Sequence, residues 1–220
     1  MVEVRKKVSY VADGFELALE PIENSINIDK TSKGFQVTYL TPDENPVNPI
    51  EEWDGNGKFY HWDNNDEKAK YEELLGYDSE TGEKKPDNPL AVRIDKYEHS
   101  GVAYSVETEG MQDQFDTSHT WAVWFPDESA MEDIKRFKSK EKQRKRAVEI
   151  ARSACELFNQ WANGEVYTIV KEVFDSKKNP IDFDTVGGYF GYEEAEKELK
   201  TWRPAKANKT SSKKKLDKVI

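Results

Sequence analysis

The chain has 220 residues, 36% of them apolar and 35% charged, and its formal net charge is −10. This length permits a sizeable core, and an aromatic share of 12% argues against disorder of the whole chain. The single cysteine, Cys155, excludes an internal disulfide and a four-cysteine metal site. The N-terminus lacks the apolar core of a signal peptide, and no apolar run is long enough to span a membrane. We therefore expect a soluble cytoplasmic protein with no membrane partner.

Alternating apolar residues predict a weak first strand at residues 2–11 and a stronger strand at residues 34–40. Residues 41–66 contain three prolines and an Asn-Gly turn signal, so they predict a long irregular segment. Loops of this length are usually functional or disordered, and the aromatic residues of this one favour order. We take as candidate binding residues in this segment Trp53, Asp54, Tyr60 and Trp62.

Residues 66–78 predict a short helix that ends at Gly76. Three strands are predicted next, at residues 90–98, 101–107 and 120–125. Their short connections are typical of an antiparallel meander.

A helix is predicted to begin at Ser129, because Ser129 and Glu132 fit the Ser-x-x-Glu capping box. Residues 138–146 contain no apolar side chain, whereas residues 147–161 carry apolar residues at helical spacing. One continuous helix would measure roughly 50 Å, with its middle in solvent. A break near Ser139 is the alternative, and both remain open.

Residues 165–174 give the strongest strand pattern in the chain, and residues 176–185 predict a turn or hairpin loop. Residues 186–202 predict a short strand followed by an amphipathic helix. Residues 205–220 have no core-forming pattern, and we expect a disordered basic tail. The fold class is therefore α+β, a mainly antiparallel sheet with two packed helices, in a single domain of residues 1–204.

Few residues offer catalytic chemistry. Ser100 and Gly101 are interpreted as the turn that starts a strand, and His99 as a hydrogen-bonding residue at a strand end, which we keep as a candidate for binding. The three histidines His61, His99 and His119 suffice in number for zinc. No two of them share a short-spacing motif, so we expect neither a metal nor a cofactor. Cys155 falls near the buried face of its predicted helix, where a thiol is usually inert.

A glycine cluster, Gly187, Gly188 and Gly191, precedes the last predicted helix. Exposed backbone N–H groups there would suit a phosphate. The cluster lacks the lysine and hydroxyl residue of a P-loop, and Glu193 and Glu194 follow it. Tight packing is the favoured interpretation of the glycines.

Charge is unevenly distributed. Residues 1–134 contain 12 Lys or Arg against 30 Asp or Glu, whereas residues 135–220 contain 21 against 13. Residues 135–146 alone carry eight basic side chains, which suffices for contacts with phosphates. Solvated faces and a solubilising tail are the plainer explanation. The candidate residues for direct binding of nucleic acid are Lys135, Arg136, Lys142, Arg144, Lys145 and Arg146.

Four short segments occur in a distinctive order: NPIEEWD at 48–54, YEHSGVAYS at 97–105, LFNQWANGEVYTIV at 157–170 and GGYFGYEEAEKEL at 187–199. In this order they resemble a family of bacteriophage and prophage proteins without an assigned reaction. The resemblance covers residues 48–199 in patches. The chain departs from the family by an extra residue in NPIEEWD and by DTSHTWAVWF in place of a Trp-Asp-Ser-Gly segment. The resemblance implies a phage source and an accessory role.

Three functions follow as expectations. The first is a phage-encoded acidic interaction protein that inhibits a host factor, a nucleic-acid-handling defence system of the restriction or CRISPR type, by imitating nucleic acid. The second is a small metal-dependent hydrolase or nucleotide-processing enzyme, which requires the histidines to converge on carboxylates. The third is nucleic-acid binding through residues 135–146, which requires that run to be ordered and free of acidic neighbours.

Overall fold

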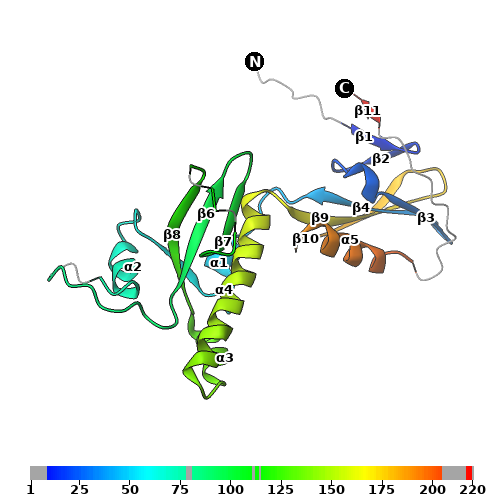
Figure 1. Ribbon diagram of the computed structural model, residues 1–220. Coiled ribbons are helices and arrows are strands. Elements are labelled where there is room, and N and C mark those ends of the chain that lie inside the picture. The colour runs from blue at the N-terminus through cyan, green and yellow to red at the C-terminus, as the bar shows by residue number, and fades with distance from the viewer. Residues whose placement is uncertain (1–8, 78–80, 111, 114, 205–216, 220) are drawn as a thin grey trace. The chain divides into compact units, whose positions relative to one another are not determined.

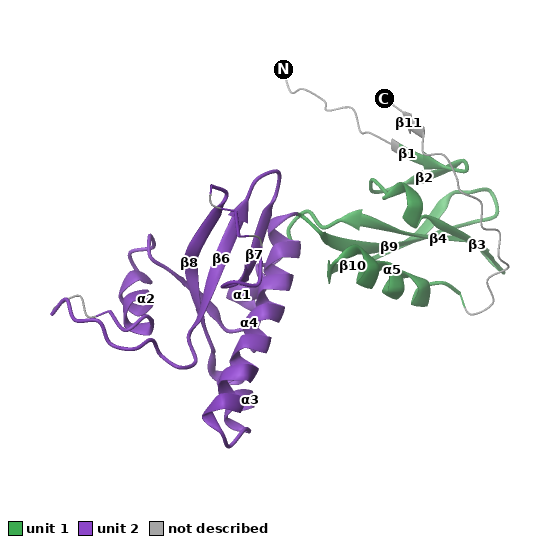
Figure 2. Cartoon of the chain, viewed as in Figure 1, with its two compact units in different colours: residues 1–46, 164–220 green, residues 47–163 purple. Residues whose placement is uncertain are grey.

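The computed structural model of the protein describes residues 9–77, 81–110, 112–113, 115–204 and 217–219. These residues divide into two compact units (Figure 2). Unit 1 comprises residues 1–46 with 164–220, and unit 2 comprises residues 47–163. Unit 2 is therefore continuous in sequence and is inserted between two segments of unit 1.

Unit 1 is built on an antiparallel four-stranded sheet with the order β10-β9-β4-β3 (Figure 1). Its two central strands, β4 and β9, come from opposite sides of the insertion and pair from Phe35 with Phe174 to Pro42 with Tyr167. The elements of unit 1 are β1 (Ser9–Ala12), β2 (Phe15–Leu17), the 3-10 helix η1 (Glu23–Ser25), β3 (Asn27–Thr31), β4 (Gly34–Pro42), β9 (Val166–Phe174), β10 (Pro180–Phe190), α5 (Tyr192–Thr201) and β11 (Asp217–Val219).

Both faces of this sheet are covered by other elements of unit 1. Successive side chains of a strand point to opposite faces of the sheet, so neighbouring residues of β4 and β9 pack in different clusters. On one face Tyr39 and Val170 pack with Phe15 of the β1–β2 hairpin. On the other face Leu40 and Ile169 pack with residues of α5. This double burial explains why β9 has buried apolar residues on both faces, among them Ile169 and Val170.

Unit 2 contains a second antiparallel sheet, with the order β5-β8-β6-β7. One face packs against α4 through a large cluster that includes Trp124 and Phe158. Leu74 of α2 packs with Ala91 and Val123 in a separate cluster. The elements of unit 2 are α1 (Pro49–Glu52), β5 (Lys58–His61), α2 (Lys68–Leu74), β6 (Val92–Glu98), β7 (Val102–Val106), β8 (Thr117–Phe125), α3 (Glu128–Lys135) and α4 (Lys140–Ala162).

The α+β class with antiparallel sheets is confirmed. We expected one domain over residues 1–204; the described residues instead form two compact units. The expected disordered tail, residues 205–220, lies outside the described residues except for β11, whose backbone pairs with β1. Across the described residues, no helix is both long and apolar enough to cross a membrane.

The prediction of one long irregular segment at residues 41–66 is wrong in its middle, where α1 and β5 form. Between them the chain turns at Asp54 and Gly55, two residues before the predicted Asn56 and Gly57, and bends at Asn56. Gly57 has φ +71°, and a Cβ there would clash with the Trp124 ring. The Trp124 Nε1–H donates to the Asn56 oxygen at 2.6 Å, so a tertiary contact fixes this turn.

The predicted capping box at Ser129 is also wrong. Helix α3 is capped by Asp127, whose Oδ1 accepts from the Ala130 N–H at 2.8 Å. The other oxygen, Oδ2, accepts from the N–H groups of Gly55 and Gly57 at 2.8 and 2.9 Å. These two bonds span 72 and 70 residues of the sequence, so no local sequence pattern could reveal them.

Candidate nucleic-acid interface

The basic run, residues 135–146, extends over the end of α3, a short connection and the first two turns of α4. The break predicted as one of two alternatives is present, and Ser139 caps α4 by accepting from the Lys142 N–H at 3.2 Å. The run is therefore ordered and held on two helices. Five exposed lysines lie on it, and we call them the lysine face: Lys135, Lys138, Lys140, Lys142 and Lys145.

The two helices are joined by an ionic contact at Asp133. This carboxylate on α3 accepts from Arg146 Nε of α4 at 2.6 Å and lies 3.4 Å from Arg136 Nη1. Gln143 of α4 adds a hydrogen bond to the Phe137 oxygen at 2.7 Å. These contacts fix the angle at which α4 leaves α3, and so hold the lysine face in place.

The arginines and lysines of the run have different surroundings. Arg144 is half-buried and donates to the backbone oxygen of Ala91, and its burial lowers its pKa. Arg146 contacts Glu149 as well as Asp133. The ion pairs of this run to other described residues are those of Arg136 and Arg146. The predicted site residues Arg144 and Arg146 thus contact their own chain, and the lysines remain available.

The local electrostatics favour an anion. Lys140 and Lys142 lie in the first turn of a 23-residue helix, where the helix dipole is positive and cations are disfavoured. Glu141 is the one acidic residue of that turn. Phe137, 38% exposed, lies between Arg136 and Lys138 in the connection. Exposed cations on a positive helix end, next to an exposed ring, match the chemistry of phosphates and stacked bases.

The aromatic candidates do not form one surface. Tyr60 packs with the Leu74 cluster and is half-buried, so it belongs to the core. Trp53 follows α1 and is 38% exposed, whereas Trp62 follows β5 and is 59% exposed. Asp54 is exposed beside Trp53. The sequence analysis assigned these residues to one loop. In the structure, strand β5 lies between Trp53 and Trp62 along the chain.

The histidines lie in three separate settings. The His99 Nδ1 is 2.9 Å from Asp116 Oδ2 beside the β6–β7 turn, as expected of a hydrogen-bonding residue at a strand end. His119 Nδ1 is 3.3 Å from the buried Asp95. The His61 ring lies against Trp121 at a centroid distance of 4.3 Å. Within the described residues, no group of three or more His, Cys, Asp or Glu is arranged to hold a metal ion.

The remaining nucleophile candidate is inert. Cys155 on α4 is 2% exposed, and burial raises the pKa of its thiol to about 12. It packs in the same cluster as Trp124 and Phe158. This agrees with the interpretation of Cys155 as packing.

Sequence reasoning found the basic run but missed how its residues divide. Lys138, Lys140 and Phe137 belong to the exposed surface. The sequence offered a signal for Lys140 alone, a lysine in the first turn of a helix, where the helix dipole disfavours cations. The chain was compared with protein-family models, with curated proteins and with solved structures, and none matched.

Proposed function

We propose that the protein binds nucleic acid through the lysine face, by neutralising backbone phosphates. One observation carries the proposal: the five lysines are exposed and have no ion pair within the described part of the chain, while Arg146 braces the helices that present them. Phosphate contacts by Lys and Arg dominate the affinity of such proteins.

The negative net charge of the chain, −10, is compatible with the binding of nucleic acid. At 0.15 M salt, charges are screened over about 8 Å. Helix α4, with 23 residues, is about 34 Å long, and the lysine face occupies only its first turns. The run is not free of acidic neighbours, because it contains Glu141 and its arginines contact Asp133 and Glu149. Those two carboxylates are paired with arginines, so an anion at this end experiences the five lysines more strongly than the distant carboxylates.

The test is a comparison of two variants with the same charge change. The first replaces all five residues of the lysine face by Gln. The control replaces five other exposed lysines by Gln: Lys30, Lys33, Lys58, Lys68 and Lys177. Binding of a fluorescent DNA duplex is followed by anisotropy. We expect loss of at least about 100-fold in affinity for the first variant, from several phosphate contacts, and little change for the control. Equal affinities of the two variants would refute the proposal.

A second candidate is an acidic interaction protein that binds a basic host factor, as expected for a phage anti-defence protein. It is supported by exposed carboxylates next to exposed tryptophans: Glu51, Glu52 and Asp54 flank Trp53, and Asp63 follows Trp62. Tryptophans often dominate the binding energy of interfaces. Co-purification of one host protein, lost in the Trp53→Ala and Trp62→Ala variants but kept in the lysine-face variant, would favour this candidate.

A further inference from the structure

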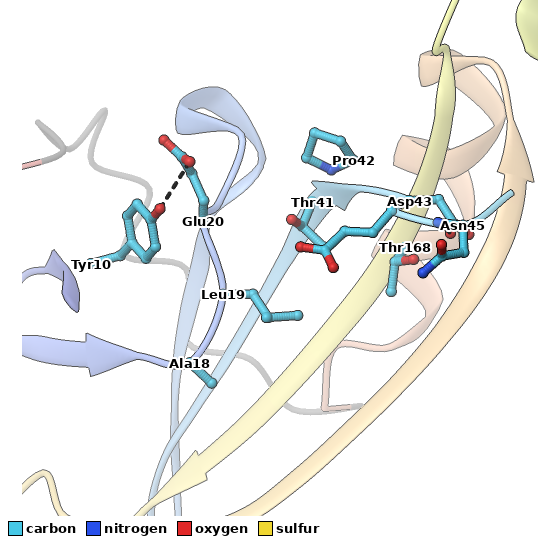
Figure 3. Close-up of a pocket in the computed structure, with 10 residues that line it drawn as sticks. Tyr10, Ala18, Leu19, Glu20, Thr41, Pro42, Asp43, Asn45 and Thr168 are labelled. Atoms are coloured by element: carbon cyan, nitrogen blue, oxygen red, sulfur yellow. Dashed lines mark hydrogen bonds between the residues drawn. The ribbon is translucent and has the colours of Figure 1, made fainter. Parts of the chain in front are cut away.

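Unit 1 contains a pocket of about 470 Å³ on the face of its sheet that also carries the β1–β2 hairpin (Figure 3). One side is formed by Tyr10 of β1 and by residues 18–20, which follow β2. The opposite side is formed by residues 41–45 at the end of β4, and by Thr168 of β9.

The first wall is fixed by hydrogen bonds to the sheet. The Ala18 N–H donates to Oε1 of the buried Glu172 at 3.0 Å, and the Leu19 N–H donates to the Tyr39 hydroxyl at 3.2 Å. The Tyr39 hydroxyl donates in turn to Glu172 Oε1 at 2.7 Å. Burial raises the pKa of Tyr39, which keeps this donor protonated. The wall is therefore preformed.

The floor of the pocket carries two hydroxyl groups, of Thr41 and Thr168, for which the described residues show no hydrogen-bond partner. Thr41 and Thr168 are directly opposed in the β4–β9 ladder, so their side chains share one face. That face also carries Tyr39, two residues before Thr41. Thr41 is only 8% exposed, and among the described residues its hydroxyl has no hydrogen-bond partner. Because Thr41 lines the pocket, a ligand or water there can supply the hydrogen bond that its hydroxyl lacks.

The second wall explains the glycine pair noted in the sequence. Asp43 Oδ2 accepts from the Gly188 N–H at 2.9 Å, and Oδ1 accepts from the Asn45 N–H at 3.1 Å. A Cβ on Gly187 would lie 2.5 Å from Asp43 Oδ2 and 2.9 Å from Thr168 Oγ1. Glycine at position 187 thus permits the Asp43 carboxylate and the Thr168 hydroxyl to lie close together.

The lining is acidic and rich in acceptors. Its described residues include the carboxylates Glu20, Asp43 and Glu44, and no Lys, Arg or His. Leu19 and Pro42 add an apolar surface. We propose that this pocket binds an organic cation with several N–H donors, a guanidinium or a primary ammonium group on an aliphatic stem. The head group would donate to the carboxylates and to the threonine hydroxyls, and the stem would lie along the apolar side.

The experiment is an amide NMR titration of the full-length ¹⁵N-labelled protein with agmatine. We expect saturable shifts at Thr41 and Thr168, with a dissociation constant in the millimolar range or below. Hexamethonium, a bis-quaternary ammonium dication, has the same charge of +2 as agmatine and no N–H donor, and it should produce no such shifts. The absence of shifts with agmatine, or equal shifts with hexamethonium, would overturn the proposal.

Variants separate a binding role from a structural one. Glu20→Gln should weaken agmatine binding about tenfold, as expected for a lost charge-assisted hydrogen bond. Glu23→Gln is the matched control, because Glu23 is exposed and does not line the pocket. Thr41→Val keeps the side-chain size and removes the partnerless hydroxyl, so it should weaken binding without lowering the midpoint of thermal unfolding. The proposal would be contradicted if Glu20→Gln and Thr41→Val bound agmatine as tightly as the control Glu23→Gln.

A further comparison identifies the source of the cation. A capped Gly-Arg-Gly peptide carries the same guanidinium on a protein chain. Binding of both agmatine and the peptide would indicate a pocket that accepts an arginine side chain of a partner. Binding of agmatine alone would indicate a free small cation. Each result supports the same recognition chemistry.

Discussion

Arginine and lysine are used differently within a single basic run. Arg144 and Arg146 each reach an oxygen of their own unit, at Ala91 and at Asp133. A planar guanidinium with five donors suits such fixed contacts, whereas a flexible, strongly hydrated ammonium suits a diffuse anionic partner. The identity of each basic residue therefore indicates whether it braces the helices or contacts a partner.

His61 gives a prediction for the effect of pH on stability. Burial is the main influence on its pKa and lowers it, against smaller opposing effects of Glu67 and Asp63. The unfolded chain therefore takes up this proton at a higher pH than the folded chain. Above about pH 6.5, the ordinary pKa of histidine, the side chain is neutral in both states and costs nothing. As the pH falls below that value, the unfolded state is favoured and stability is lost.

The His61→Phe variant keeps a ring against Trp121 and removes the titration. We expect its free energy of unfolding to fall less steeply between about pH 6.5 and 5.5 than that of the unmodified protein. The difference between the two slopes is at most about 1.4 kcal/mol per pH unit, the contribution of one proton. Urea unfolding at several pH values measures both slopes. Identical slopes would show that His61 does not titrate differently in the two states.

At the scale of elements, local patterns predicted well where local interactions decide. The strands β4, β6, β7, β8 and β9 and the helices α2 and α5 all lie where alternation or helical spacing placed them. The meander predicted for the strands β6, β7 and β8 is wrong, because β6 lies between the other two and pairs with both. The prediction of Ser129 as the N-cap of α3 was wrong because Asp and Ser are both favoured at that position, so the local sequence does not distinguish Asp127 from Ser129. Contacts of Asp127 with Gly55 and Gly57, distant in sequence, decide between them.

This choice of cap is directly testable. Asp127→Ala removes the cap bond and two tertiary hydrogen bonds, so we expect a loss of about 2–3 kcal/mol in the free energy of unfolding. Ser129 is exposed, so Ser129→Ala should change that free energy by no more than about 0.5 kcal/mol. Urea denaturation of the two variants gives both values. A larger loss for Ser129→Ala would restore the capping-box interpretation.

At the scale of the whole molecule, the division into two units could not be predicted from alternation or spacing. The pairing of β4 with β9 joins residues on either side of a 117-residue insertion, and strand patterns do not specify partners across such a separation. The same limit hid the pocket, because Thr41 and Thr168 meet only through this pairing. The basic run could be predicted because its residues are consecutive.

Each hydrophobic cluster lies within one unit, which predicts that unit 2 folds alone. We expect a fragment of residues 47–163 to unfold cooperatively and to bind a DNA duplex as tightly as the full chain, because the whole lysine face belongs to it. Circular dichroism and anisotropy measure the two properties. A folded fragment that no longer binds would place the interface elsewhere.

The most direct measurement of the central claim is the salt dependence of duplex binding by the full-length protein. Contacts of five lysines with phosphates predict that the logarithm of the association constant falls against the logarithm of the salt concentration with a slope of about −4 to −5. Replacing one lysine of the lysine face by Gln should reduce the steepness by about one. Binding that is independent of salt, or a slope unchanged in the five-lysine variant, would contradict the assignment of the lysine face as the nucleic-acid interface.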